Sequence, residues 1–193
     1  MTSEMGQAVQ IGQAVLTARD FASAMMDSLP QNVKVIYPST LSTQYNSALG
    51  IIYIQGNSTD LDYFDWDVIM HEYGHHISHE CNITDGPYLT NHDSATNNAD
   101  VLNDKSKGVR LAWSESWPTI FGELAQQYFS SILVDITNVK DYAYSDTTNP
   151  VLGIDYDYDS LTDYLGEACE RSIMAILWDL FDTTNEDGDT ISL

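Results

Sequence analysis

The chain has 193 residues, 43% of them hydrophobic, and this length and composition predict one globular domain spanning residues 1–193. Its 29 acidic and 7 basic residues give a net charge of −22. This charge argues against nucleic acid and anionic membranes as partners, because both bind through basic surface, and it suits cations, metal ions or simple solubility.

The N-terminal part of the chain is predicted to alternate between helix and strand. Apolar residues at helical spacing predict a helix over residues 7–28. Runs rich in β-branched and aromatic residues then predict strands at 33–39 and 48–56. No run approaches the roughly 20 apolar residues of a membrane-spanning helix. The start MTSEMGQAVQ lacks the features of a signal peptide, and we expect a piece of a longer exported protein.

The segment 58–80, STDLDYFDWDVIMHEYGHHISHE, predicts a second helix capped by Ser58 or Thr59. Its apolar residues recur at helical spacing and form one stripe: Trp66, Ile69, Met70, Tyr73 and Ile77. The stripe predicts that one side of this helix is buried against the core.

The C-terminal part begins with a polar segment, residues 81–108, which is predicted to be a long loop. Residues 109–133 are predicted to be helical, with Pro118 as a kink or a break near the start. A connector rich in Tyr and Asp follows at 141–160, and a last helix is expected over 160–182. Its apolar side is formed by Leu165, Ile173, Ile176, Leu177 and Leu180.

Four of the five histidines lie within residues 67–80, and two of them form an H-E-x-x-H motif with a glutamate: His71, Glu72 and His75. Residues four apart on a helix share one face, so the two imidazoles can bind one zinc ion at about 2.0–2.1 Å. Glu72 lies about 100° around the helix, where its carboxylate can take a proton from a water held at the metal. The motif therefore predicts a zinc-dependent hydrolase.

A catalytic zinc ion usually has three protein ligands, so a third must come from elsewhere in the chain. The pattern H-x-x-G-x-x-H does not apply, because Ser78 and Asn82 occupy the glycine and second histidine positions. The other known arrangement takes a glutamate from a later helix. Glu115, within the apolar stretch LAWSESWPTIFGE, is the favoured ligand, and Glu123 is the alternative.

HEYGHH followed by the W-S-E-S-W segment resembles the gluzincin metallopeptidases, the clan of thermolysin and fungalysin. The segment GEACERSIMAILWDLFD is similar to a C-terminal segment of fungalysin-like proteins, and the resemblance spans roughly residues 30–182. It implies an α+β, zincin-like fold, with a small mixed sheet over an active-site helix and a mainly helical lower part.

The resemblance further implies that His71, His75 and Glu115 bind Zn²⁺ and that Glu72 is catalytic. The strand at Ile52–Ile54 would then be the edge strand that aligns a peptide or protein substrate. An extracellular or cell-surface location is also expected on this basis. The resemblance gives no substrate specificity and no oligomeric state.

Two positions depart from the gluzincin pattern. An aspartate that supports a histidine ligand is expected four residues after the glutamate ligand, and this position is Thr119. The family also uses a downstream histidine to stabilise the oxyanion, whereas no histidine follows residue 92. Tyr164, one residue from that position, is the expected substitute. The alternatives are Tyr156, Tyr158 and Arg171.

The remaining polar residues have less specific interpretations. His76 and His79 are expected at the surface or in support of the ligands, and His92 in the polar loop is expected to be exposed. Cys81 and Cys169 form either one disulfide or two thiols. Oxygen donors around Gly188 suit Ca²⁺ or form a solvated acidic end: Asp182, Asn185, Asp187 and Asp189.

The favoured function is hydrolysis of peptide bonds by a water that Glu72 activates at a zinc ion. The first alternative is a catalytically weak or inactive zincin-like module with a binding or surface role, for which the two departures argue. The second is a hydrolase that uses the same metal site on a non-peptide amide or on a peptide attached to glycan.

Overall fold

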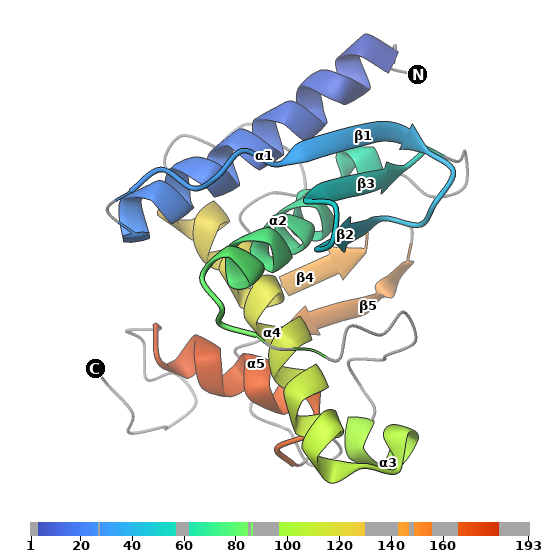
Figure 1. Ribbon diagram of the computed structural model, residues 1–193, viewed down its shortest axis with the longest axis vertical. Helices are drawn as coiled ribbons and strands as arrows, with labels where there is room; N and C mark the ends of the chain where they lie inside the picture. The colour runs from blue at the N-terminus through green and yellow to red at the C-terminus, as the bar shows by residue number, and fades with distance from the viewer. Residues whose placement is uncertain are drawn as a thin grey trace.

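The computed structural model describes residues 4–26, 28–56, 62–84, 86, 97–129, 143–146, 149–155 and 166–181. It is a mixed α+β structure in which helices predominate over a small sheet (Figure 1). The helices are α1 (Glu4–Met26), the 3₁₀ helix η1 (Asp62–Phe64), α2 (Trp66–Glu80), α3 (Asn98–Leu102), α4 (Lys105–Tyr128) and α5 (Glu170–Asp179). The strands are β1 (Lys34–Ser39), β2 (Gln44–Asn46), β3 (Ile51–Gln55), β4 (Ala143–Asp146) and β5 (Asn149–Asp155). None of the described helices is long and apolar enough to cross a membrane.

Strand β3 lies in the centre of a three-stranded sheet with the order β1-β3-β2. It pairs in parallel with β1 and antiparallel with β2, and its alternate residues Ile52 and Ile54 are fully buried. The prediction that Ile52–Ile54 forms a free edge strand is therefore wrong, because both edges of β3 are already paired. The short strand β2 is the edge strand next to α2.

Helix α2 begins at Trp66, and the side chain of Asp65 caps it by accepting a hydrogen bond from the Val68 backbone N–H at 3.2 Å. The helix thus starts later than predicted, and Ser58 and Thr59 lie outside the described residues. The predicted apolar stripe is confirmed, since all of its members are buried: Trp66, Ile69, Met70, Tyr73 and Ile77. These residues share one core with α1, the sheet and part of α4.

Helices α2 and α4 cross in close contact, and glycines lie at the crossing. A Cβ atom added to Gly74 would lie 2.7 Å from the Cα atom of Pro118. A Cβ atom on Gly122 would meet that of Met70 at 3.2 Å. Side chains at either glycine would separate the helices, so these two residues set how closely α2 and α4 approach.

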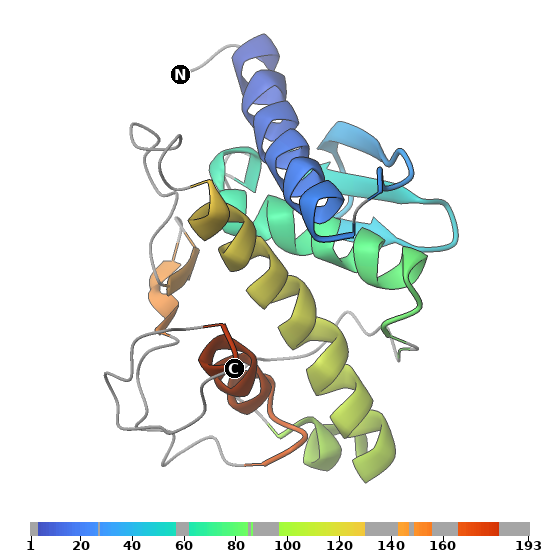
Figure 2. The ribbon, with the colours of Figure 1, turned by 90° about the vertical axis from the view of Figure 1, so that its left-hand side faces the viewer.

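Helix α4 continues through Pro118, so the proline neither starts nor breaks it. The helix begins at Lys105, four residues before the predicted start, after an N-cap at Asp104 that accepts from the Lys107 N–H at 3.1 Å. Figure 2 shows α4 crossing α2 diagonally on the side where α1 also packs. The predicted continuation at 130–133 lies outside the described residues.

The lower part contains α3 and α5 against α4, and the hairpin of β4 and β5 (Figure 1). The predictions of a loop at 81–108 and a connector at 141–160 missed α3 and this hairpin. Helix α5 starts at Glu170, later than predicted, and its exposed residue Ile176 does not belong to the buried side. The buried side is formed by Met174, Leu177 and Trp178. Cys81 and Cys169 are both free thiols.

Candidate metal centre

His71, His75 and Glu115 come together where α2 crosses α4. One ligand atom from each residue lies within 4.8 Å of the others. The distance to Glu115 Oε2 is 3.2 Å from His75 Nε2 and 3.5 Å from His71 Nε2. The two imidazole rings meet edge to face with their centroids 4.6 Å apart. The three residues predicted as ligands therefore form one cluster.

The two nitrogen–oxygen distances in the cluster fit a zinc ion. Ligand atoms placed tetrahedrally at about 2.0–2.1 Å from zinc are about 3.3–3.4 Å from one another. The two distances from Glu115 Oε2, 3.2 and 3.5 Å, lie on either side of this value. Two imidazole nitrogens and one carboxylate oxygen are also the donor set that catalytic zinc sites use, with one position left open.

The cluster is largely withdrawn from water but is not fully buried. The side chains of His71 and His75 are 12% and 11% exposed, and that of Glu115 is 6% exposed. A buried carboxylate needs a positive partner, because desolvation of an isolated charge is costly. The cluster provides such a partner either as a protonated imidazole or as a bound cation.

Glu72 is 8% exposed and is held by the sheet. Its Oε2 atom accepts a hydrogen bond from the backbone N–H of Tyr45 in β2 at 2.6 Å. The carboxylate follows His71 directly on α2, about 100° further around the helix. The Glu72 carboxylate is thus held in one orientation by its hydrogen bond to Tyr45, and it is not one of the three clustered residues.

Thr119 connects two members of the cluster. Its hydroxyl lies 2.8 Å from His71 Nδ1 and donates to the backbone carbonyl of Glu115 at 3.0 Å. Thr119 is four residues after Glu115, so one turn of α4 places its side chain beside the same imidazole. At the position where an aspartate was expected, the Thr119 hydroxyl is therefore in contact with the predicted ligand His71.

The other histidines lie outside the cluster. His76 is 5% exposed, and its Nε2 atom lies 3.1 Å from the backbone carbonyl of Gln31. Its ring also packs against Tyr45 and Tyr73. His79 is exposed, with its ring 6.1 Å from that of Tyr45. His76 thus packs against Tyr45 of β2, and neither residue is part of the cluster.

Glu123, the alternative ligand, is 1% exposed two turns along α4 from Glu115 and is not among the clustered residues. Arg171 lies on α5. Several predicted residues lie outside the described part of the chain: Tyr164, Tyr156, Tyr158, His92 and the acidic residues 182–189. Their roles stay predictions.

Three features of the site were not predicted from the sequence. The contact of Tyr45 uses a backbone N–H, so no side-chain pattern indicates it. Gly74 lies inside the motif, but its contact with Pro118 depends on the helix crossing. The position of Thr119 was detectable from the sequence, since it shares a helix face with Glu115. Its contact with His71 was not.

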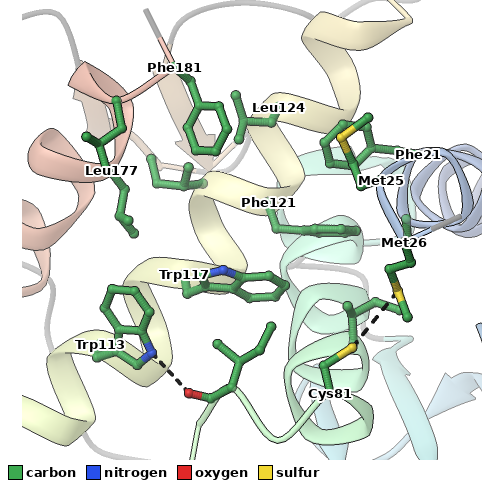
Figure 3. A pocket seen from close by; sticks show the side chains of 15 residues that line it. Phe21, Met25, Met26, Cys81, Trp113, Trp117, Phe121, Leu124, Leu177 and Phe181 are labelled. Atoms are coloured by element: carbon green, nitrogen blue, oxygen red, sulfur yellow. Dashed lines mark hydrogen bonds between the residues drawn. The ribbon is translucent and has the colours of Figure 1, made fainter. Parts of the chain in front are cut away.

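An apolar cavity of about 380 Å³ lies between α1, α2, α4 and α5 (Figure 3). It is lined on α4 by Trp113, Trp117 and Leu124, which point away from Glu115 and Thr119 around the helix. The Trp113 indole N–H donates to the Ile83 carbonyl at 3.3 Å. The lining of the cavity is hydrophobic except for the Cys81 thiol, and the pKa of this thiol is raised by burial and by Glu80. The cavity therefore offers no metal ligand set of its own among these residues.

Comparison with known proteins gives no relative: no protein-family model, curated protein or solved structure matches this chain. The chemistry of the cluster therefore has to be inferred from its residues and their geometry.

Proposed function

We propose that this chain is a zinc-dependent hydrolase of the gluzincin type, with a zincin-like fold, that cleaves peptide bonds. The observation that carries the proposal is the position of Glu115 Oε2, 3.2 and 3.5 Å from the Nε2 atoms of His75 and His71. Two helices thereby present two nitrogens and one oxygen, and both nitrogen–oxygen distances match those of a tetrahedral zinc site. Glu72, beside them, is the general base.

When bound, zinc would polarise the scissile carbonyl and lower the pKa of a water. Glu72 would accept the proton of that water and return a proton to the leaving amine. The Tyr45 N–H, at 2.6 Å, keeps one oxygen of Glu72 in place, so the carboxylate is oriented before substrate arrives. Tyr164 remains the proposed residue for stabilising the oxyanion.

The edge strand β2 is the element that an extended peptide would join. Among the described strands it pairs only with β3, and its residue Tyr45 donates its backbone N–H to Glu72. A peptide that adds to β2 would run past the general base. It would pair with backbone groups of β2 other than the Tyr45 N–H, which already donates to Glu72, and alternate side chains would provide the specificity. This assignment replaces β3, whose two edges are both occupied.

Zinc content of purified protein is the first test. We expect about one zinc per chain in the wild type and its loss in Glu115→Gln and His75→Ala, measured by elemental analysis and by competition with a chelator. Glu123→Gln is the matched control, since it also neutralises a buried carboxylate of α4 but should retain zinc. Absence of zinc from the wild type after incubation with excess metal would refute the proposal.

Peptide cleavage is the second test. Zinc-loaded wild type should cleave members of an unstructured peptide library, and Glu72→Gln should bind zinc but lose cleavage. The other candidate function is a zincin-like binding module without catalysis, which Thr119 and the lack of a histidine after residue 92 favour. Zinc binding without cleavage of peptides or simple amides would support that module and contradict the hydrolase.

A further inference from the structure

The hydroxyl of Thr119 has two contacts but only one proton. Its oxygen lies 3.0 Å from the backbone carbonyl of Glu115, which can only accept, and 2.8 Å from His71 Nδ1. Both contacts are hydrogen bonds only if the hydroxyl donates to the carbonyl and accepts from Nδ1–H. The opposite arrangement would leave two oxygen atoms facing each other at 3.0 Å without a proton, in a side chain that is 3% exposed.

This arrangement fixes the tautomer of His71. In the neutral imidazole, a proton on Nδ1 leaves Nε2 with its lone pair. Nε2 is the atom that lies 3.5 Å from Glu115 Oε2, so a nitrogen and an oxygen with lone pairs face each other across the cluster. That pair repels in the absence of a positive charge and binds a cation that enters between them.

We propose that Thr119 is a positioning residue that holds His71 in the Nδ1–H tautomer and directs its Nε2 lone pair at the metal position. The inference rests on the proposed metal site and adds a residue that the sequence showed only as a departure. Through a single hydroxyl, Thr119 links the imidazole of one ligand to the backbone of another. It therefore sets both the tautomer and the orientation of His71 relative to Glu115.

The hydroxyl also differs from the expected aspartate in charge. With Thr119, the three ligands and their support contain one negative charge, that of Glu115. An aspartate would add a second negative charge. The site would then bind a divalent cation more strongly, and the bound cation would withdraw electrons from a substrate less effectively. The neutral support therefore favours a cation that keeps more of its positive charge for the substrate.

The tautomer can be tested in the zinc-free protein, so this test does not depend on metal binding. Nitrogen-15 NMR of the imidazoles should be recorded well above the ordinary histidine pKa of about 6.5. The His71 signals, assigned with His71→Gln, should show the Nδ1–H form in the wild type and in Thr119→Ser. Thr119→Val, which keeps the shape but loses the hydroxyl, should lose this preference. A wild-type His71 in the Nε2–H form would overturn the inference.

Zinc affinity gives the second readout, measured by chelator competition. Loss of the hydroxyl in Thr119→Val should weaken binding about 10–100-fold, because outer partners of ligating histidines typically contribute this much. Thr119→Ser should bind nearly as tightly as the wild type, and Thr119→Asp more tightly. Equal affinity of the wild type and Thr119→Val would show that Thr119 only packs. If the chain bound no zinc at all, the proposed function would fail, while the NMR result would still decide the tautomer.

Discussion

Replacing Gly74 with alanine tests the helix crossing that assembles the cluster. The new Cβ atom would lie 2.7 Å from Pro118 Cα and 2.9 Å from Pro118 Cβ. Ordinary carbon contacts are about 3.5–4.0 Å, so α2 and α4 would have to separate by about 1 Å. Overpacking of this kind costs about 1–3 kcal/mol, and the better helix propensity of alanine returns about 1 kcal/mol. We expect a net loss of up to about 2 kcal/mol in the free energy of unfolding.

The same displacement would also disturb the proposed metal site. Glu115 and Thr119 lie within three residues of Pro118 on α4 and would move with it. A shift of about 1 Å would lengthen the 2.8 Å contact between Thr119 and His71 Nδ1 beyond hydrogen-bond distance. It would also spread the ligand atoms beyond the spacing of a tetrahedral site. Zinc affinity should therefore fall at least as far as it does in Thr119→Val.

The assay combines urea unfolding in the presence of EDTA with chelator competition for zinc. Gly12→Ala is the matched control, because a Cβ atom on this glycine of α1 has nothing within 4 Å. That variant should gain about 0.5–1 kcal/mol and bind zinc normally. If Gly74→Ala were as stable as Gly12→Ala and kept wild-type affinity, the close crossing of α2 and α4 would not be what positions the ligands.

Two further predictions concern helix α2. Asp65→Ala should lower the free energy of unfolding by about 1 kcal/mol in urea titrations, because it removes the cap on the Val68 N–H; unchanged stability would show that the helix does not start there. Among the described residues, no partner lies within hydrogen-bond distance of the buried Tyr73 hydroxyl, so Tyr73→Phe should raise the stability by about 1 kcal/mol, with the exposed Tyr128→Phe as a neutral control. Burial raises the pKa of Tyr73, so an unfolded chain ionises first, and wild-type stability should fall relative to Tyr73→Phe as the pH rises above 10.0. A difference that stays constant across this pH range would contradict that ordering of pKa values.

The parts of the fold that the sequence predicted are those encoded by local periodicity. The apolar stripe of α2 repeats every three or four residues, which indicates a helix. On a helix, His71 and His75, four residues apart, face the same direction. Glu115 was identified in the same way, as a carboxylate within an apolar helical stretch. Each of these predictions depends on residues within a few turns of one helix, so no knowledge of distant contacts is needed.

The features that the sequence did not predict depend on contacts between distant residues. Strand β2 has three residues and no buried side chain, and only its pairing with β3 makes it a strand. Strands β4 and β5 lie in a segment rich in Tyr, Asp and Asn, whose few apolar residues, Val151, Leu152 and Ile154, are too short a run to predict a hairpin. Helix α4 extends back over the charged residues Lys105 and Lys107 because Asp104 caps it, a local signal that the polar composition concealed.

The two halves of the proposed chemistry are positioned by different parts of the fold. All three proposed ligands lie on α2 and α4, so their spacing depends on the contact between Gly74 and Pro118. Glu72 lies on the same helix as two of them, but its carboxylate is oriented by the backbone of β2. A change at the helix crossing therefore acts on the proposed metal ligands, whereas a change in β2 acts on the proposed general base. Metal affinity and proton transfer should accordingly be separable by mutation, although His71 and Glu72 are adjacent in the chain.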